Sequence, residues 1–131
     1  MVFRVEEDEV RRLVRVTMEG VFDKDEVAAM VGRAREISTA RRWNILYDMR
    51  SATRGRMGPG DVFWLPRQHP ALRGADVANV RVATLHTPAL GEAALFWENA
   101  FRNAGLQARA FTEEAPALEW LMRKGPASPS T

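Results

Sequence analysis

Residues that could do chemistry follow two apolar runs of this chain, at the points where strands would end. Asp48 and Arg50 follow one run, and His86 follows the other. If both strands are parallel, these side chains share the carboxyl edge of a sheet, where open α/β folds bind ligands. Asp48 and His86 could then act as an acid–base pair, with Ser51 supplying a hydroxyl group. Because nothing in the spacing singles this pair out, we assign no catalytic residue.

Arginines extend the same region. Arg54 and Arg56 lie in the adjoining loop, and residues 50–81 include six arginines and two acidic residues. Guanidinium groups and the free amides of a helix start could together bind a phosphate, a carboxylate or an acidic protein surface. The simpler interpretation is that Asp48 and Arg50 form a salt bridge that shapes the loop, and that the other arginines are solvated. Both interpretations stay open.

Composition argues against several classes of site. The chain has 131 residues, a net charge of +2, two histidines and no cysteine. These values argue against disulfides, cysteine-type zinc sites, histidine-rich metal centres and a dedicated nucleic-acid binder, and we expect no cofactor. No apolar run is long enough to span a membrane, and the N-terminal residues lack a signal-peptide pattern, so we expect a cytoplasmic protein.

The chain is expected to form a single domain over residues 1–124, followed by a disordered tail over residues 125–131. The tail has nothing to bury. Within the domain, residues 49–60 are rich in glycine and arginine and have almost no apolar anchor. We therefore predict that this segment is the most mobile internal part of the chain.

Apolar patterning predicts the elements that position these residues. Alternation of apolar and polar residues predicts an antiparallel hairpin at the N-terminus, and the later strands alternate with helices, which is typical of parallel crossover units. The expected fold is α/β, a mixed five-stranded sheet with four helices. The predicted strands are residues 2–6, 13–18, 43–47, 80–85 and 108–111, and the predicted helices are residues 23–41, 61–68, 91–104 and 112–124.

Local signals place the ends of these helices. Asp23 begins a capping box. The first helix is then expected to bury an apolar stripe, to carry Arg35 on its other face and to fray over residues 38–41. Gly105 follows the third helix at the position of a Schellman ending. Thr112 is predicted to cap the last helix.

Large apolar residues on the predicted helices have three possible roles. Residues 63–65 are all large and apolar, and Phe96 and Trp97 are consecutive, so they cannot all face one way on a helix. They could pack in the core, form an interface between two copies of the chain, or line a cleft for a hydrophobic ligand. Trp64 and Trp97 in particular lead us to expect a homodimer, since small oligomers are most often two-fold dimers.

The order of the elements and several short motifs resemble a known family. The motifs are residues 18–20 (Met-Glu-Gly), 45–50 (Ile-Leu-Tyr-Asp-Met-Arg), 81–83 (Arg-Val-Ala) and 110–111 (Ala-Phe), the last followed by Ala115, Glu119, Trp120 and Leu121. Together they resemble the SpoIIAA-like proteins of the STAS superfamily, small bacterial proteins of the STAS/SEC14 type. The resemblance implies a mixed sheet with helices and a binding or regulatory role rather than catalysis.

One feature of that family is missing from this chain. Anti-sigma-factor antagonists of the STAS type carry a serine that a partner kinase phosphorylates, in an Asp-Ser-Ser-Gly-like motif opening the helix after the central strand. The equivalent stretch here, residues 51–61, has only Ser51 and Thr53 as hydroxyl groups, and both precede the predicted helix start. The resemblance therefore does not extend to a phosphorylation switch.

Three functional hypotheses follow. The first is a non-enzymatic cytoplasmic regulatory or protein-interaction module that self-associates. The second is a carrier or sensor of a small apolar or anionic ligand, and the third is a hydrolase-type enzyme using Asp48 and His86. The candidate ligand- or partner-binding residues are Asp48, Arg50, Arg54, Arg56, Trp64 and His86. A cavity between the second and third helices would favour a carrier, and a flat apolar patch an interaction module.

Overall fold

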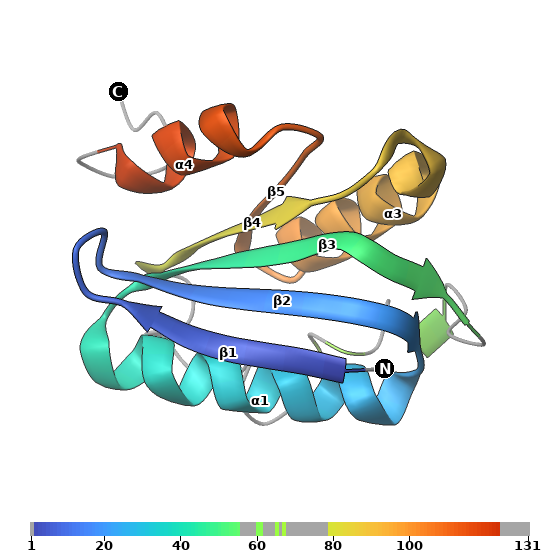
Figure 1. The fold of residues 1–131 in the computed structure, drawn as a ribbon, viewed down its shortest axis with the longest axis horizontal. Helices are drawn as coiled ribbons and strands as arrows, with labels where there is room; N and C mark the ends of the chain where they lie inside the picture. Colours follow the sequence, from blue (N-terminus) through green and yellow to red (C-terminus); the bar gives the residue numbers. More distant parts are fainter. Residues whose placement is uncertain (1, 56–59, 62–64, 66, 68–78, 124–131) are drawn as a thin grey trace.

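A computed structural model of the chain describes residues 2–55, 60–61, 65, 67 and 79–123. It contains a five-stranded sheet in which the strands follow one another in chain order, β1-β2-β3-β4-β5 (Figure 1). The first two strands pair antiparallel and all later neighbours pair parallel, which confirms the predicted mixed sheet. The strands are β1 (Val2–Asp8), β2 (Leu13–Phe22), β3 (Asn44–Arg54), β4 (Arg81–Leu85) and β5 (Gln107–Phe111).

Helices cover both faces of this sheet. Of the expected helix over residues 61–68 only residues 61, 65 and 67 are described, and all three are helical. Three α-helices, where four were expected, are described from end to end, together with a short 3-10 helix. They are α1 (Lys24–Arg41), α3 (Gly91–Asn103), α4 (Glu114–Met122) and the 3-10 helix η3 (Pro88–Leu90). The predicted helix over residues 61–68 and the predicted tail over residues 125–131 lie largely or wholly outside the described residues.

Two apolar clusters show which helix covers which face. The first cluster joins Met30 and Val31 of α1 and Phe101 of α3 to the sheet. The second joins Ala117 and Leu121 of α4 to the other face of the sheet. Consequently α1 and α3 lie on one face and α4 on the opposite face (Figure 1).

The ends of two helices confirm the predicted caps. The carboxylate of Asp23 accepts a hydrogen bond of 3.0 Å from the Glu26 amide at the start of α1. After α3, Gly105 has a φ of +90°. The amides of Leu106 and Gly105 donate to the carbonyls of Phe101 and Arg102, both at 3.0 Å, which is a Schellman ending.

Three local predictions about helices are wrong. The first helix does not fray, because it continues to Arg41, and the Ser38 hydroxyl in its last turn donates to the Trp43 carbonyl at 2.6 Å. The last helix begins later than expected, with Glu113 rather than Thr112 at the cap position and no side-chain cap. Arg35, expected on the outer face of α1, is only 2% exposed.

The central strand is longer than predicted. β3 continues to Arg54 and pairs along this extension with β2, Glu19 opposite Ser51 and Phe22 opposite Arg54, after an irregularity in the ladder between Thr17 and Glu19. The first half of the segment over residues 49–60 is therefore strand rather than loop. The rest of that segment falls mainly outside the described residues.

Candidate functional site

Four charged side chains form one hydrogen-bonded group on the α4 face of the sheet, which we call the charge network. They are Arg15 of β2, Asp48 and Arg50 of β3, and Glu114, the first residue of α4. Arg50 holds the Asp48 carboxylate with two parallel hydrogen bonds, Nε to Oδ1 at 2.9 Å and Nη2 to Oδ2 at 2.8 Å. The Arg50 amide donates to the same carboxylate at 3.1 Å.

Arg15 links the network to the helix. Its Nη2 donates to Glu114 Oε1 at 2.8 Å and to Asp48 Oδ2 at 3.2 Å. Arg50 also reaches Glu114, at 3.2 Å. Two guanidinium groups and two carboxylates thus balance one another and tie the start of α4 to strands β2 and β3.

Both carboxyl groups of the network are held in their charged form. The hydrogen bond from Arg15 is the main reason that the pKa of Glu114 is lowered. Burial by itself would raise the pKa of Asp48, but the hydrogen bonds from Arg50 and the charge of Arg15 outweigh it, so the net shift of that pKa is downward. The network is therefore fully charged at neutral pH.

The sequence pointed to half of this network. Asp48 and Arg50 were predicted to lie together, and the salt bridge between them is the simpler of the two interpretations offered for that pair. Arg15 and Glu114 were missed. Alternation placed Arg15 on the polar side of its strand, but only the parallel pairing of β2 with β3 reveals that it lies beside Asp48.

His86 lies in a different setting. It is buried, its Nδ1 lies 2.8 Å from the Thr87 carbonyl oxygen, and its amide donates to the Phe111 carbonyl at 3.0 Å. In the described part of the chain no hydrogen bond joins Asp48 to His86. Ser51 is exposed on β3, opposite Glu19.

The remaining predicted site residues can be placed only in part. The backbone of Arg54 ends β3, opposite Phe22. Its side chain, Arg56 and Trp64 lie outside the described residues. Trp97 is not on the surface: it is buried and stacks on Phe101 with ring centroids 4.5 Å apart. Of the three roles that the sequence left open for Trp97, the structure therefore shows core packing.

Another arginine binds the end of α4 at the amino-terminal edge of the parallel strands, away from the charge network. Arg81, the first residue of β4, is buried, and its Nη1 donates to the carbonyls of Trp120 at 2.8 Å and Arg123 at 2.6 Å. These are carbonyls of the last turn of a helix, which have no partner within the helix. The Arg81 amide donates to the Asn44 side chain at 2.8 Å. Arg81 thus has a structural role.

A buried guanidinium with two nitrogens that have no hydrogen-bond partner among the described residues lies inside the other layer. Arg35 of α1 is 2% exposed, and within the described structure neither its Nε nor its Nη1 has a hydrogen-bond partner. Burial lowers the pKa of Arg35. Tyr47 of β3 is buried on the same side, and burial raises its pKa to about 12. The indole Nε1 of Trp97 also lacks a partner in this layer.

Among the described residues, no group of three or more histidine, aspartate or glutamate side chains is arranged to hold a metal ion. None of the described helices combines the length and the apolar character that crossing a membrane requires.

The chain is similar to a solved structure described as an uncharacterised protein from the DUF3478 family with a SpoIIAA-like fold, from Shewanella loihica PV-4. The similarity covers 92% of this chain and 92% of that one, with 17% sequence identity and a TM-score of 0.49. That similarity concerns the fold alone. No family model and no curated protein matches the chain.

Proposed function

We propose that this chain is a non-enzymatic, cytoplasmic regulatory or protein-interaction module that binds an acidic protein surface at the charge network. The observation that supports this most is the state of Arg50. Asp48 fixes its guanidinium with two parallel hydrogen bonds, yet 41% of its side chain is exposed. A charged group that is already held in place loses little side-chain entropy when a partner binds.

The sheet around Arg50 is open to a partner. Alternation along β2 places Arg15 and Thr17 on the same face of the sheet as the buried Leu13. On the neighbouring strand β1, Glu6 lies beside Arg15 and Arg4 lies beside Thr17. The helix on this face, α4, packs on β3, β4 and β5. The face formed by β1 and β2 therefore presents mainly charged side chains, a composition that favours an electrostatically matched protein partner.

A photo-crosslinking amino acid at Thr53, an exposed position near the end of strand β3, tests this function in cells. We expect a discrete crosslinked product that is lost when Arg54 and Arg56 are both changed to alanine, because the sequence predicts these two arginines among the partner-binding residues. The melting temperature should stay nearly unchanged, since solvated charges of the kind predicted here contribute little to stability.

The matched control carries the same crosslinker at Arg33, an exposed position on α1, and should give no such product. A double variant that crosslinks as well as the parent chain but melts much lower would mean that Arg54 and Arg56 are structural. That result would contradict partner binding at this edge.

We further propose that the module self-associates through α3. Leu95 and Phe96 are consecutive on that helix and remain 55% and 40% exposed, which leaves two large apolar side chains together on the surface. Contiguous exposed apolar residues are typical of interfaces. They replace Trp97, which is buried, as the residues that motivate a homodimer.

Sedimentation analysis of the purified chain should therefore show a dimer at micromolar concentration. Changing Leu95 and Phe96 together to serine should shift the chain to a monomer, because the exposed apolar area that drives association is lost. Met122, which is 48% exposed on α4, supplies the control: Met122→Ser should leave the dimer intact. A wild-type monomer over the same concentrations would refute self-association.

A carrier or sensor of a small anionic ligand is the second candidate. It is supported by Arg35, whose buried Nε and Nη1 have no hydrogen-bond partner among the described residues. An unpaired buried charge is costly, and a bound anion would offset that cost. The free energy of unfolding of Arg35→Met distinguishes this carrier or sensor from the interaction module.

A further inference from the structure

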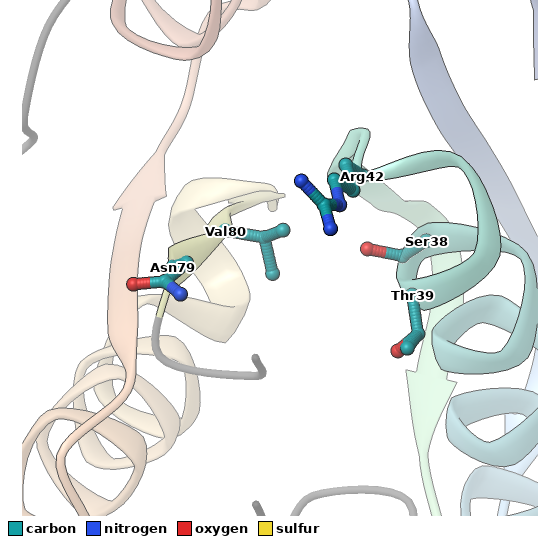
Figure 2. Close-up of a pocket in the computed structure, with 5 residues that line it drawn as sticks. All are labelled: Ser38, Thr39, Arg42, Asn79 and Val80. Atoms are coloured by element: carbon teal, nitrogen blue, oxygen red, sulfur yellow. The ribbon is translucent and has the colours of Figure 1, made fainter. Parts of the chain in front are cut away.

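A second polar site lies at the amino edge of the sheet, opposite the edge that holds Arg50. A pocket of about 300 Å³ opens between the last turn of α1 and the residues that precede β4. Its lining residues are Ser38, Thr39, Arg42, Asn79 and Val80. Figure 2 shows the guanidinium of Arg42 and the side chain of Val80 reaching toward one another across this space, with the hydroxyl of Ser38 facing it.

The charges around the pocket are unbalanced. The neighbouring Arg41 pairs with Glu7 at 2.7 Å and Glu9 at 3.5 Å. Arg42, by contrast, makes no ion pair and no side-chain hydrogen bond within the described part of the chain, and none of the described residues that line the pocket is acidic. Arg35 stands seven residues earlier, which is about two helical turns, and adds a second uncompensated charge on the same side of α1.

The backbone beneath Arg42 is fixed in place. Arg42 ends α1 in the left-handed conformation, with a φ of 60°, and its amide donates to the Ser38 carbonyl. The Trp43 amide reaches the same carbonyl at 3.2 Å, and the Ser38 hydroxyl donates back to the Trp43 carbonyl. This local bonding partly satisfies the negative end of α1, which would otherwise repel an anion from the pocket.

We propose that this pocket binds a small organic anion, with Arg42 gripping a carboxylate or phosphate group and Val80 forming the apolar wall beside it. A guanidinium can hold two oxygens of either group with parallel hydrogen bonds. The volume of the pocket is at the lower end of the range for small-molecule sites, so the ligand is a small one. The site is separate from the partner surface around Arg50, because it lies at the other end of the parallel strands.

Amide chemical shifts of isotope-labelled protein test the proposal during titration with sodium butyrate and, separately, sodium phosphate, with sodium chloride as the ionic-strength control. We expect saturable shifts at Ser38, Thr39 and Val80 with at least one of the two anions. Tighter binding of butyrate would identify a carboxylate ligand with an apolar part, and tighter binding of phosphate a phosphate ligand. Sodium chloride should produce no saturable shift.

Variants of Arg42 decide whether the anion is held as proposed. Arg42→Gln keeps a polar, hydrogen-bonding side chain and removes its charge, so binding should weaken about tenfold or more. Arg42→Lys keeps the charge but cannot donate two parallel hydrogen bonds, so it should also bind more weakly than wild type. Arg33→Ala, an exposed change on the same helix, should bind like wild type. Undiminished binding by Arg42→Gln, or shifts that sodium chloride reproduces, would overturn the proposal.

Discussion

Replacing Arg35 by methionine is expected to raise the free energy of unfolding by about 1–4 kcal/mol. Arg35 is 2% exposed, and its Nε and Nη1 have no hydrogen-bond partner among the described residues. Folding therefore removes a guanidinium from water without replacing the hydrogen bonds of these two nitrogens, whereas methionine is a shorter, unbranched apolar side chain that carries no such penalty. Urea denaturation measures the change, and Arg33→Met on the exposed side of α1 should alter stability by no more than about 0.5 kcal/mol.

The same variant tests whether the chain carries an anion. If an anionic ligand pairs with Arg35, native mass spectrometry of the wild-type protein should show added mass that Arg35→Met lacks. The wild-type protein would then be the more stable of the two, because a ligand that binds only the folded state stabilises it. A more stable Arg35→Met with no added mass in either protein would exclude an anion bound at Arg35 and remove the observation that supports the carrier function.

Asp48→Asn is expected to lower the free energy of unfolding by about 2–3 kcal/mol. The substitution leaves the two guanidinium groups of Arg15 and Arg50 with one remaining carboxylate, Glu114, and replaces a carboxylate that accepts hydrogen bonds from both. Both arginines are partly exposed, so water compensates for part of the loss. Glu119→Gln, an exposed change on α4, is the control and should have little effect.

The pH dependence of stability checks the same network. The pKa values of Asp48 and Glu114 are lowered in the folded protein, so the folded state binds fewer protons than the unfolded state at mildly acidic pH. Their contribution to stability is complete above the ordinary carboxyl range, about pH 4–5, and is lost as the pH falls through the lowered values. Asp48→Asn should therefore lose less stability than wild type between about pH 6 and pH 3. Equal acid sensitivity in the two proteins would contradict this account.

Elements whose signals are local could be predicted from the sequence. The strands of the hairpin, the cap at Asp23 and the ending at Gly105 each depend on a few neighbouring residues, and the structure has all three. The length of β3 does not depend on local signals. Residues 49–54 carry two arginines and a serine and read as a loop, but β2 offers pairing partners to residues 51–54 after an irregularity in the ladder.

The candidate site illustrates the same limit. Asp48 and Arg50 lie two residues apart, so their contact could be inferred, whereas Glu114 is 64 residues from Arg50 and joins it only through the packing of α4. Arg35 was placed on the wrong face because its charge was taken as a sign of exposure. Its spacing of four residues from Val31 and three from Ser38, both buried, carried the correct signal.

The position of β1 at the edge of the sheet has a consequence for the chain at high concentration. One side of β1 pairs with β2, and within the described sheet its other side has no neighbouring strand. Exposed edges of this kind can recruit strands of other molecules and begin aggregation. Along β1, the charged side chains of Arg4, Glu6 and Glu7 are exposed. A strand that paired with this edge would have to pack its own side chains beside those charges. These residues therefore act as a barrier to fibre growth, and neutralising them would reduce solubility before it reduced stability.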